Sequence, residues 1–357
     1  MIYYLVTSKH QYTMNTYLST WGNDIKNRIS VITYQDLQHQ SYLPIGTYIF
    51  SDIERLTPSQ VIIATHVKNQ LLLADENIQI LNDPVNSYRR YSLLDDLWHS
   101  KINNFRAIKL KDIVNEKIKY PVFLREENEH SGSLTGLIYN KRELYDICFQ
   151  LLLRKLCLKN ILVVEFCDTS DESRLYRKYA AFKIGSRIIP RQLIFSHKWV
   201  LKFPDLIIDQ GLLEEIDYLD NNPHEEFLRD IFKKAKIEYG RIDYSLKNGK
   251  PQIWEINTNP MVMLRPEQFD SRHMEAQEIF SKSVLKAFED IDNQEQTDKK
   301  ISIDWDPEIW QQAKKEQRLL RKRKPIPFLY KLYVNYPSLF RPIGYLIQFA
   351  IWIRAKT

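Results

Sequence analysis

Apolar residues recur in short runs over the first part of the chain, with polar stretches between them. Residues 2–7, 29–34, 47–50 and 78–81 have the composition and length of buried strands. Between the third and fourth runs, Ser59 to Ala74 spaces its apolar residues as a helix packed on a sheet does. Strands that alternate with helices predict a small α/β domain of roughly a hundred residues.

Three later segments have apolar patterns that begin or end in charged residues. Tyr88 to Lys101 predicts an amphipathic helix that starts with Arg89-Arg90. Tyr120 to Arg125 predicts a buried strand, followed by a loop of small and acidic residues at 126–136, and Ile161 to Asp168 predicts another strand that runs into an acidic loop. Arg89 and Arg90 can hold a phosphate or remain solvated charges, and the pattern leaves both interpretations open.

Residues 174–192 predict a β-hairpin around a Gly-Ser turn. Strict alternation puts Arg177, Tyr179 and Ala181 on one face and Lys178, Ala180 and Phe182 on the other. We consider Arg177 and Arg191 as contacts for a substrate carboxylate or phosphate, since a planar guanidinium matches either, with a surface salt bridge as the alternative. Lys202, in the loop that follows, is a further candidate for the acceptor site.

A second predicted hairpin, from Gly240 to Pro260, is the most informative segment. A two-residue Asn248-Gly249 turn would set Asp243 opposite Trp254 and mix acidic with apolar residues on both faces. A three-residue loop, 248–250, instead pairs Asp243 with Glu255, Arg241 with Asn257, Tyr244 with Trp254 and Ile242 with Ile256. Because this register separates a charged face from an apolar one, we predict the three-residue loop.

The charged face carries chemistry typical of a phosphate and metal site. Asp243, Glu255 and Asn257 offer side-chain oxygens, the ligands that Mg²⁺ prefers and often shares with substrate phosphates. Arg241 beside them suits a phosphate or a developing negative charge. The alternative is an ordinary hairpin with a solvated polar face.

Two stretches of this hairpin resemble a known family. Gly240-Arg241-Ile242-Asp243 and Glu255-Ile256-Asn257-Thr258-Asn259-Pro260 are similar to the C-terminal signature of ATP-grasp enzymes, and closest to the D-alanine–D-alanine ligase version. The resemblance implies that Asp243, Glu255 and Asn257 bind the Mg²⁺ ions of Mg-ATP. It also implies that Arg241 steadies the transferred phosphoryl group and the tetrahedral intermediate.

The resemblance extends more weakly to the nucleotide. It implies a phosphate contact near the start of the 88–101 helix, at Arg90 or its neighbour, and another at Arg125, where the family has a lysine. The loop that covers the phosphates would include Ser131, Gly132 and Ser133, although it holds only two glycines and three glutamates. Adenine would meet Glu165, Phe166 and Cys167, and the ribose would meet an acid among Asp168, Asp171 and Glu172.

Composition is that of an ordinary folded protein. The 357 residues are 44% hydrophobic and 27% charged, which supports a real core and two or three domains. Three dispersed cysteines without CxxC spacing favour a reducing, cytoplasmic compartment. No GxGxxG follows the first strand, and the N-terminus lacks the basic and long apolar parts of a signal peptide.

Charge is unevenly distributed. Residues 314–357 hold eleven Lys and Arg against one acid, so the preceding residues carry a net charge of −4 out of the total of +6. Pro325 to Thr357 interleaves eight aromatics with these cations, and its apolar run is too short to span a membrane. We expect either an interfacial helix on an anionic membrane surface or a helix that packs on the protein's own domain or in a dimer interface. The acidic body disfavours nucleic acid.

Together these features predict an α+β chain. Its expected parts are a pre-ATP-grasp α/β domain (1–105), an ATP-grasp domain (106–291) and a linker with a basic, aromatic helical tail (292–357). The resemblance implies an ATP- and Mg²⁺-dependent ligase that joins a small-molecule or peptide carboxylate to an amine through an acyl phosphate. An ATP-grasp kinase and a non-catalytic, membrane-recruited nucleotide-binding module are the alternatives.

The membrane interpretation makes a prediction for the tail. A chain without residues 314–357 should lose most of its binding to anionic vesicles, because each surface cation contributes about 1 kcal/mol there. Co-sedimentation with liposomes measures the loss, with neutral vesicles as the control. Equal sedimentation of the two chains would favour a tail packed on protein.

Overall fold

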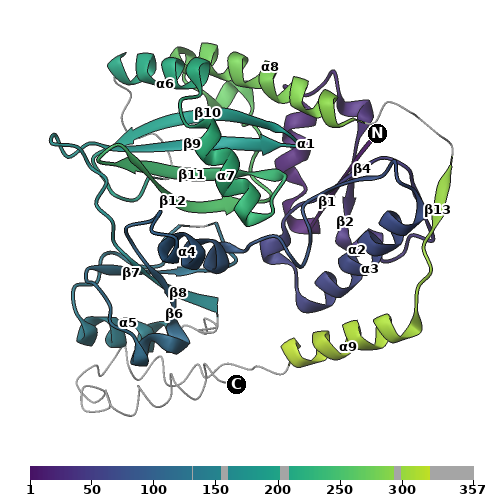
Figure 1. Cartoon of the computed structure of the whole chain (residues 1–357), viewed down its shortest axis with the longest axis horizontal. Helices are drawn as coiled ribbons and strands as arrows, with labels where there is room; N and C mark the ends of the chain where they lie inside the picture. Colours follow the sequence, from purple (N-terminus) through teal and green to yellow (C-terminus); the bar gives the residue numbers. More distant parts are fainter. Residues whose placement is uncertain (131, 154–159, 202–208, 293–298, 322–357) are drawn as a thin grey trace. The chain divides into compact units, whose positions relative to one another are not determined.

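The computed structural model describes residues 1–130, 132–153, 160–201, 209–292 and 299–321. The chain forms two compact units, one made of residues 1–89 and 169–320 and the other containing residues 90–168 (Figure 1). Both units combine helices with sheets, which confirms the mixed α and β content. The three-part division at residues 105 and 291 stays a prediction.

The first sheet of the larger unit has four parallel strands in the order β2-β1-β4-β5. The strands are β1 (Ile2–Val6), β2 (Ile29–Thr33), β4 (Thr47–Phe50) and β5 (Gln79–Leu81), and they confirm the four predicted runs. Helices α1 (Tyr12–Leu18), α2 (Tyr34–Leu37) and α3 (Pro58–Ala74) lie between them in the chain. Every residue of β1 and β4 is buried, as expected of a parallel sheet covered on both faces.

Helix α3 begins where the sequence provides a cap. The Thr57 hydroxyl accepts a hydrogen bond from the Gln60 backbone N–H, and the Gln60 side chain accepts one from the Thr57 N–H. Pro58 occupies the first turn, where its missing N–H costs nothing.

The second sheet of this unit is antiparallel, in the order β10-β9-β11-β12. Its strands are β9 (Tyr176–Ile184), β10 (Arg187–Ser196), β11 (Tyr239–Lys247) and β12 (Lys250–Asn257), so both predicted hairpins are present. They join edge to edge through β9 and β11, a pairing that no local pattern indicated.

Helices cover both faces of this second sheet. Lys183 of β9 lies over the Phe232 ring of α7 (Glu225–Ala235), with 5.8 Å from its Nζ to the ring centroid. The next residue back, Phe182, faces the other way, and its ring lies 5.4 Å from that of Phe280 in α8 (Met274–Ile291). Helix α6 (Asp209–Asn221) packs along β10 (Figure 1).

Two short turns precede helix α8. The α-helix begins at Met274, after two 3-10 turns at Pro266–Gln268 and Ser271–His273. The Asp270 carboxylate accepts a hydrogen bond from the Arg272 N–H, at 3.0 Å, which starts the second turn as a separate element.

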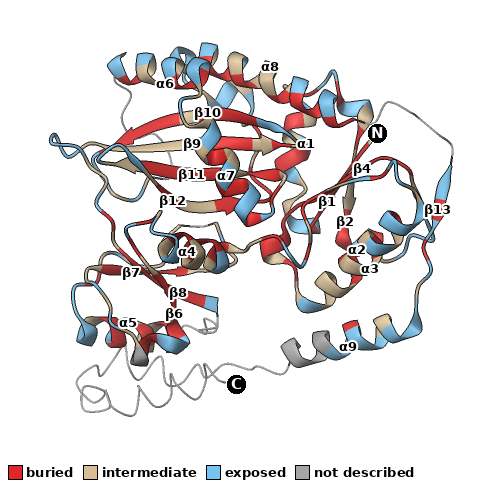
Figure 2. Cartoon of the chain, in the orientation of Figure 1, coloured by how far each residue is buried: buried red, intermediate tan, exposed pale blue. Residues whose placement is uncertain are grey.

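One buried cluster joins the two sheets of the larger unit. Tyr4 of β1 meets the Tyr239 ring of β11 edge-on at 5.4 Å, and Tyr239 in turn contacts Phe288 of α8. These residues belong to a core that also includes Phe182 and Val262. Figure 2 shows the buried positions concentrated on β1, β4 and the β9–β11 strands.

The smaller unit has its own sheet and core. Strands β6 (Ala107–Lys109), β8 (Ile161–Glu165) and β7 (Val122–Glu126) are antiparallel in that order, with helices α4 (Arg90–His99) and α5 (Lys141–Leu153) in the same unit. These elements confirm the strands predicted at 120–125 and 161–168 and the helix predicted at 88–101. Leu124, Val163, Leu144 and Cys148 are among the residues that fill its core.

Beyond α8 the structure adds a strand pairing that the sequence did not indicate. Strand β13 (Lys300–Ser302) pairs antiparallel with β3 (Tyr42–Pro44), and α9 (Pro307–Arg321) follows it. The basic and aromatic tail from residue 322 onward lies outside the described residues. Within the described ranges, no helix has both the length and the apolar character needed to cross a membrane.

Asn82 anchors the first sheet to the second. Its amide Nδ2 donates to Phe50 O (3.0 Å) and Tyr239 O (2.8 Å), and its Oδ1 accepts from the N–H groups of Glu238 (2.8 Å) and Tyr239 (3.0 Å). The residue is 1% exposed and has a φ of 66°, which asparagine tolerates better than most residues.

We expect Asn82→Ala to lower the free energy of unfolding by about 3 kcal/mol, because four backbone groups lose a buried partner and alanine is strained at this φ. Urea unfolding measures the change. The exposed Asn86 of the same loop is the matched control, and Asn86→Ala should stay within about 0.5 kcal/mol of wild type. Equal effects of the two changes would contradict the anchoring role.

Candidate functional site

The β11–β12 hairpin brings the predicted metal residues together. Asp243 pairs with Glu255 and Arg241 with Asn257 across the ladder, and Ile242 pairs with Ile256, as predicted. Side chains of directly opposed residues share a face of the sheet. Arg241, Asp243, Glu255 and Asn257 therefore lie on one face.

The turn of this hairpin differs from the prediction. Lys247 pairs with Lys250, so the loop has two residues, Asn248 and Gly249, both in the left-handed region with φ values of 52° and 74°. Two-residue loops of this kind match the twist of the flanking strands. The predicted three-residue loop was wrong.

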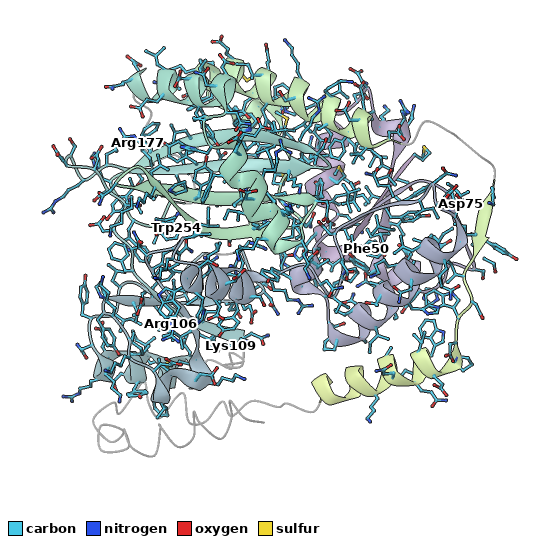
Figure 3. All side chains as sticks on the ribbon, viewed as in Figure 1. Phe50, Asp75, Arg106, Lys109, Arg177 and Trp254 are labelled. Atoms are coloured by element: carbon cyan, nitrogen blue, oxygen red, sulfur yellow. The ribbon has the colours of Figure 1, made fainter. Side chains whose placement is uncertain are left out.

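A bulge at Trp254 restores the register. Tyr244 pairs with Ile253 and Asp243 with Glu255, which leaves Trp254 without an opposite residue, so the predicted Tyr244–Trp254 pair was also wrong. The Trp254 indole donates to the Ser245 hydroxyl at 3.0 Å. Figure 3 labels Trp254 on β12.

Asp243 is buried and held by two cations. The Arg241 Nε lies 2.8 Å from Asp243 Oδ1 and Nη2 lies 3.2 Å from Oδ2, while the Lys178 Nζ lies 3.4 Å from Oδ2. Burial lowers the pKa of Arg241 and the contacts with Asp243 and Glu255 raise it, leaving it above its ordinary value. The guanidinium thus stays charged at all working pH values.

Lys178 belongs to this site, although the sequence pattern did not single it out. Its strand, β9, pairs with β11 so that Ala180 lies opposite Asp243, and Lys178 is two residues away on the same face. The Lys178 Nζ also donates to Leu201 O at 2.9 Å. The predicted alternation of the first hairpin gave the correct face, but only the β9–β11 pairing brings Lys178 to Asp243.

The residues after Asn257 tie this strand to the first sheet. The Asn257 Oδ1 accepts from the Asn259 N–H at 2.9 Å, and the Asn259 Oδ1 accepts from Tyr4 Oη (2.7 Å) and Thr13 Oγ1 (2.6 Å). Thr258 donates to the Glu54 carboxylate and accepts from the Ile53 N–H. Asn257 is therefore fixed by bonds that run to the first strand of the chain.

Close to Thr258 and Asn259, a buried group of polar residues follows the carboxyl ends of β1 and β4. Asp52 is fully buried with a φ of 57°, and its carboxylate contacts the Thr7 hydroxyl, the His10 Nδ1 (2.9 Å) and the Arg55 Nη1 (2.5 Å). This is the edge of a parallel sheet at which ligands usually bind. Sequence reasoning missed these residues because they lie in connections without a motif.

The predicted ligands fit a magnesium ion that is shared with phosphates. They provide two carboxylates and one amide oxygen, and the amide oxygen of Asn257 retains a second lone pair beside its bond to Asn259. Among the described residues there is no cluster of three or more His, Cys, Asp or Glu side chains that could hold a metal by itself. Mg²⁺ bound through one or two carboxylates plus substrate phosphates needs no such cluster.

A second polar group of residues lies on the same sheet face, around Arg191 of β10. Arg191 is 5% exposed, and its guanidinium carbon lies 4.4 Å from the centroid of the Phe280 ring. Glu215 of α6 accepts from the Leu193 N–H (3.2 Å) and from His273 Nδ1 (2.8 Å). Burial lowers the pKa of Arg191 to about 10, against a raising effect of Glu215. A buried guanidinium without a bonded counter-charge costs several kcal/mol.

The other predicted substrate arginine is engaged in salt bridges. Arg177 contacts Asp171 through Nη1 (2.6 Å) and Glu214 through Nε (3.0 Å), which is the alternative that the sequence left open. Figure 3 labels Arg177 on β9. The bond to Arg177 lowers the pKa of Asp171, so that this acid is ionised. Lys202 lies outside the described residues.

The predicted nucleotide residues of the smaller unit have structural partners. Arg90 is 3% exposed, and its Nη1 donates to the carbonyls of Glu126 (2.6 Å), Glu127 (2.7 Å) and Glu129 (2.8 Å). It holds the loop that follows β7, a geometry that does not favour the predicted phosphate contact. Arg125 lies one residue before the end of β7 and is 9% exposed.

The segment predicted to meet adenine is held by hydrogen bonds to the backbone around it. The Glu165 carboxylate accepts from the N–H groups of Lys119 (2.8 Å) and Arg106 (3.2 Å), and the Phe166 N–H donates to Pro121 O (2.9 Å). Cys167 is buried. In the covering loop Gly132 has a φ of 93°, Ser133 is half-buried and Ser131 is not among the described residues. The nucleotide roles of these residues stay predictions.

Comparisons with known proteins agree with the resemblance over part of the chain. The chain is 26% identical over 155 residues to the D-alanine–D-alanine ligase of Clostridium botulinum strain Loch Maree, covering 41% of this chain and 46% of that protein. The ligase of strain Hall is 24% identical over 180 residues, 46% of this chain and 55% of that protein. The chain thus spans about half the length of the curated relatives it matches. No family model matches.

Two of the solved structures that match this chain are named as ligases. The D-alanine–D-alanine ligase of Bacillus anthracis, complexed with ATP, has a TM-score of 0.42 and 14% identity, covering 80% of this chain and 99% of that one. The L-amino acid ligase of Bacillus licheniformis has a TM-score of 0.42 and 11% identity, covering 72% of this chain and 66% of that one.

The Glu215–His273 pair predicts a pH dependence of stability. The hydrogen bond to Glu215 raises the pKa of His273 above its ordinary 6.5, and burial opposes the rise. A raised histidine pKa contributes stability that is complete below pH 6.5, where the ring is protonated in the folded and the unfolded chain alike. This stability is lost as the pH rises through the higher pKa of the folded state.

Glu215→Gln should therefore flatten the fall in stability above pH 6.5. Urea unfolding over a pH series measures the profile. His39 is exposed, so His39→Gln is the control and should keep the wild-type profile. A wild-type stability that does not fall over this range would show the pair to be uncharged.

Proposed function

We propose that this protein is an ATP-dependent carboxylate–amine ligase of the ATP-grasp type. One observation supports this most: Arg241, Asp243, Glu255 and Asn257 share one face of a hairpin, in the pairing predicted from its apolar and charged positions. The partial similarity to D-alanine–D-alanine ligases supports the same reaction class. The substrates are a small molecule or peptide with a carboxylate and a second molecule with an amine.

Mg-ATP supplies an electrophilic phosphorus and a metal charge for activating the substrate carboxylate. Asp243, Glu255 and Asn257 would hold the metal. The γ-phosphoryl group would pass to the substrate carboxylate with ADP as the leaving group, and the amine would then displace phosphate from the acyl phosphate to form the amide. Positioning and electrostatic stabilisation provide most of the catalysis in such transfers.

Arg241 and Lys178 provide the positive charge for both steps. In the present structure they neutralise Asp243. With Asp243 as a metal ligand, the Arg241 guanidinium would be available to bind the transferred phosphoryl group and the tetrahedral intermediate. Arg125 binds the phosphates of the nucleotide in this proposal, and binding of the basic tail to an anionic membrane stays a separate prediction.

ADP release tests the proposal. A panel of amino acids, peptides and amino sugars, each supplied with and without an amine acceptor, should give ADP only when a carboxylate and an amine are both present. A stable phosphorylated product without an amine would identify a kinase instead, and nucleotide binding without ADP release would identify a non-catalytic module.

Glu255→Gln and Asp243→Asn should each lower Mg-dependent ADP release by at least about a hundredfold, since each removes a charged metal ligand. Glu278 of α8 is exposed, and Glu278→Gln serves as the matched control with wild-type activity. Unchanged turnover in Glu255→Gln would refute the metal assignment.

A further inference from the structure

The Arg191 cluster, made of Arg191, Glu215, His273 and Gln277, lies on the same sheet face as the predicted metal ligands. Arg241 lies directly opposite Phe182 in the ladder, and the Phe182 ring contacts the Phe280 ring at 5.4 Å. The Arg191 guanidinium lies over that same Phe280 ring at 4.4 Å. Strand β10 is irregular between Pro190 and Gln192, which leaves Arg191 without an opposite residue.

Three buried polar atoms in this cluster have no hydrogen-bond partner within the described part of the chain. They are Arg191 Nη1, His273 Nε2 and Gln277 Oε1. His273 and Gln277 are four residues apart in consecutive helical turns, so they face the same side, and Phe280 follows three residues later on that side. Native proteins leave few such atoms unpaired, and each one indicates a missing partner.

The charges of the cluster indicate what the partner is. Glu215 is the carboxylate of the cluster, and its two oxygens are already bonded to the Leu193 N–H and to His273 Nδ1. The bond from Nδ1 leaves Nε2 as the atom that faces a ligand, and a protonated ring donates from it. With Arg191 and a protonated His273 opposing one glutamate, the cluster has an excess of one positive charge.

A single negative charge completes this balance. A water molecule would satisfy the hydrogen bonds but not the charge of the guanidinium. A doubly charged phosphate would add repulsion from Glu215, whereas a carboxylate carries one charge and two acceptor oxygens that match Arg191 and His273. The Gln277 amide can turn to donate its N–H₂ to the same group.

We propose that Arg191 and His273 form a binding subsite for a substrate carboxylate, on the sheet face that also carries Arg241. The carboxylate is one that is retained in the product, not the one activated by phosphorylation. Its role in selecting the substrate rests on the proposed function, but the binding of a carboxylate does not. The expected substrates are amino acids or peptides whose free carboxylate docks on Arg191.

Direct binding tests the subsite without any turnover. Histidines of the full chain are labelled with ¹³C at Cε1, and His273→Gln identifies the His273 signal among the eight histidines. Titration with sodium acetate should shift that signal saturably in wild type. Arg191→Met should weaken acetate binding by about tenfold or more, because a hydrogen-bonded charge pair is lost, and Arg191→Lys should retain part of it. Arg187 is an exposed arginine of β10, the strand of Arg191, and is paired with Asp290 of α8. The control variant Arg187→Met should bind acetate as wild type does.

Three outcomes would overturn the proposal. An unmoved His273 signal would mean that ordered water fills the site. Saturable binding of inorganic phosphate but not acetate would mean a phosphate site. Equal acetate binding by wild type and Arg191→Met would mean that Arg191 has no part in it.

Kinetics with matched acceptors then connects the subsite to the reaction. For an amino acid and its amide, Arg191→Met should raise the KM of the acid by about tenfold or more and leave the KM of the amide unchanged, since only the acid carries the charge that Arg191 binds. Equal effects on both would contradict the subsite. Absence of ADP release with every substrate would refute the proposed function, while the acetate titration would still decide the subsite.

Discussion

The charged face of the β11–β12 hairpin depends on a one-residue bulge at Trp254, where the register between the two strands shifts. The two-residue turn at Asn248-Gly249 by itself would place Asp243 opposite Trp254. The bulge advances β12 by one position, so that Glu255 and Asn257 reach the face of Asp243 and Arg241. The Trp254–Ser245 hydrogen bond lies at the point where the register changes.

This face is also where positive and negative side chains hold one another. Asp243 is bonded to Arg241 and Lys178 before any ligand arrives, and Glu255 also acts on Arg241, so that the two cations of this group meet two carboxylates. The Arg191 cluster has the opposite character, since its cations outnumber its one carboxylate. The two groups of residues thus suit different ligands. The first can give up its contacts between cations and Asp243 when a metal binds, whereas the second lacks an anion.

The sequence predicted local structure well and long-range contacts poorly. Alternation of apolar and polar residues was enough to find both hairpins and the Asp243–Glu255 and Arg241–Asn257 pairs, because the hydrophobic pattern selects a face. The pattern gave the right pairs with the wrong turn. An extra residue in the loop and an extra residue in the strand both shift the pairing by one position. Only the sheet shows which of the two occurred.

The contributions of Lys178, Glu215 and His273 could not be predicted in this way. They depend on the β9–β11 pairing and on the packing of α6 and α8, which no short pattern specifies. Arg90 shows that a matching residue type does not determine its contacts. Its position suited a phosphate contact, but its guanidinium donates to three backbone carbonyls of a loop more than thirty residues away.

The bond between Tyr4 and Asn259 joins residues separated by 255 positions. Contacts between such distant residues close large loops and form late, because the entropy of loop closure must be overcome before the contact stabilises anything. The oxygen of Asn257 is oriented through that bond, so its final geometry forms only once the first strand of the chain is in place. During synthesis the first strand leaves the ribosome well before the hairpin, so the strand that orients Asn257 is already available when the hairpin emerges.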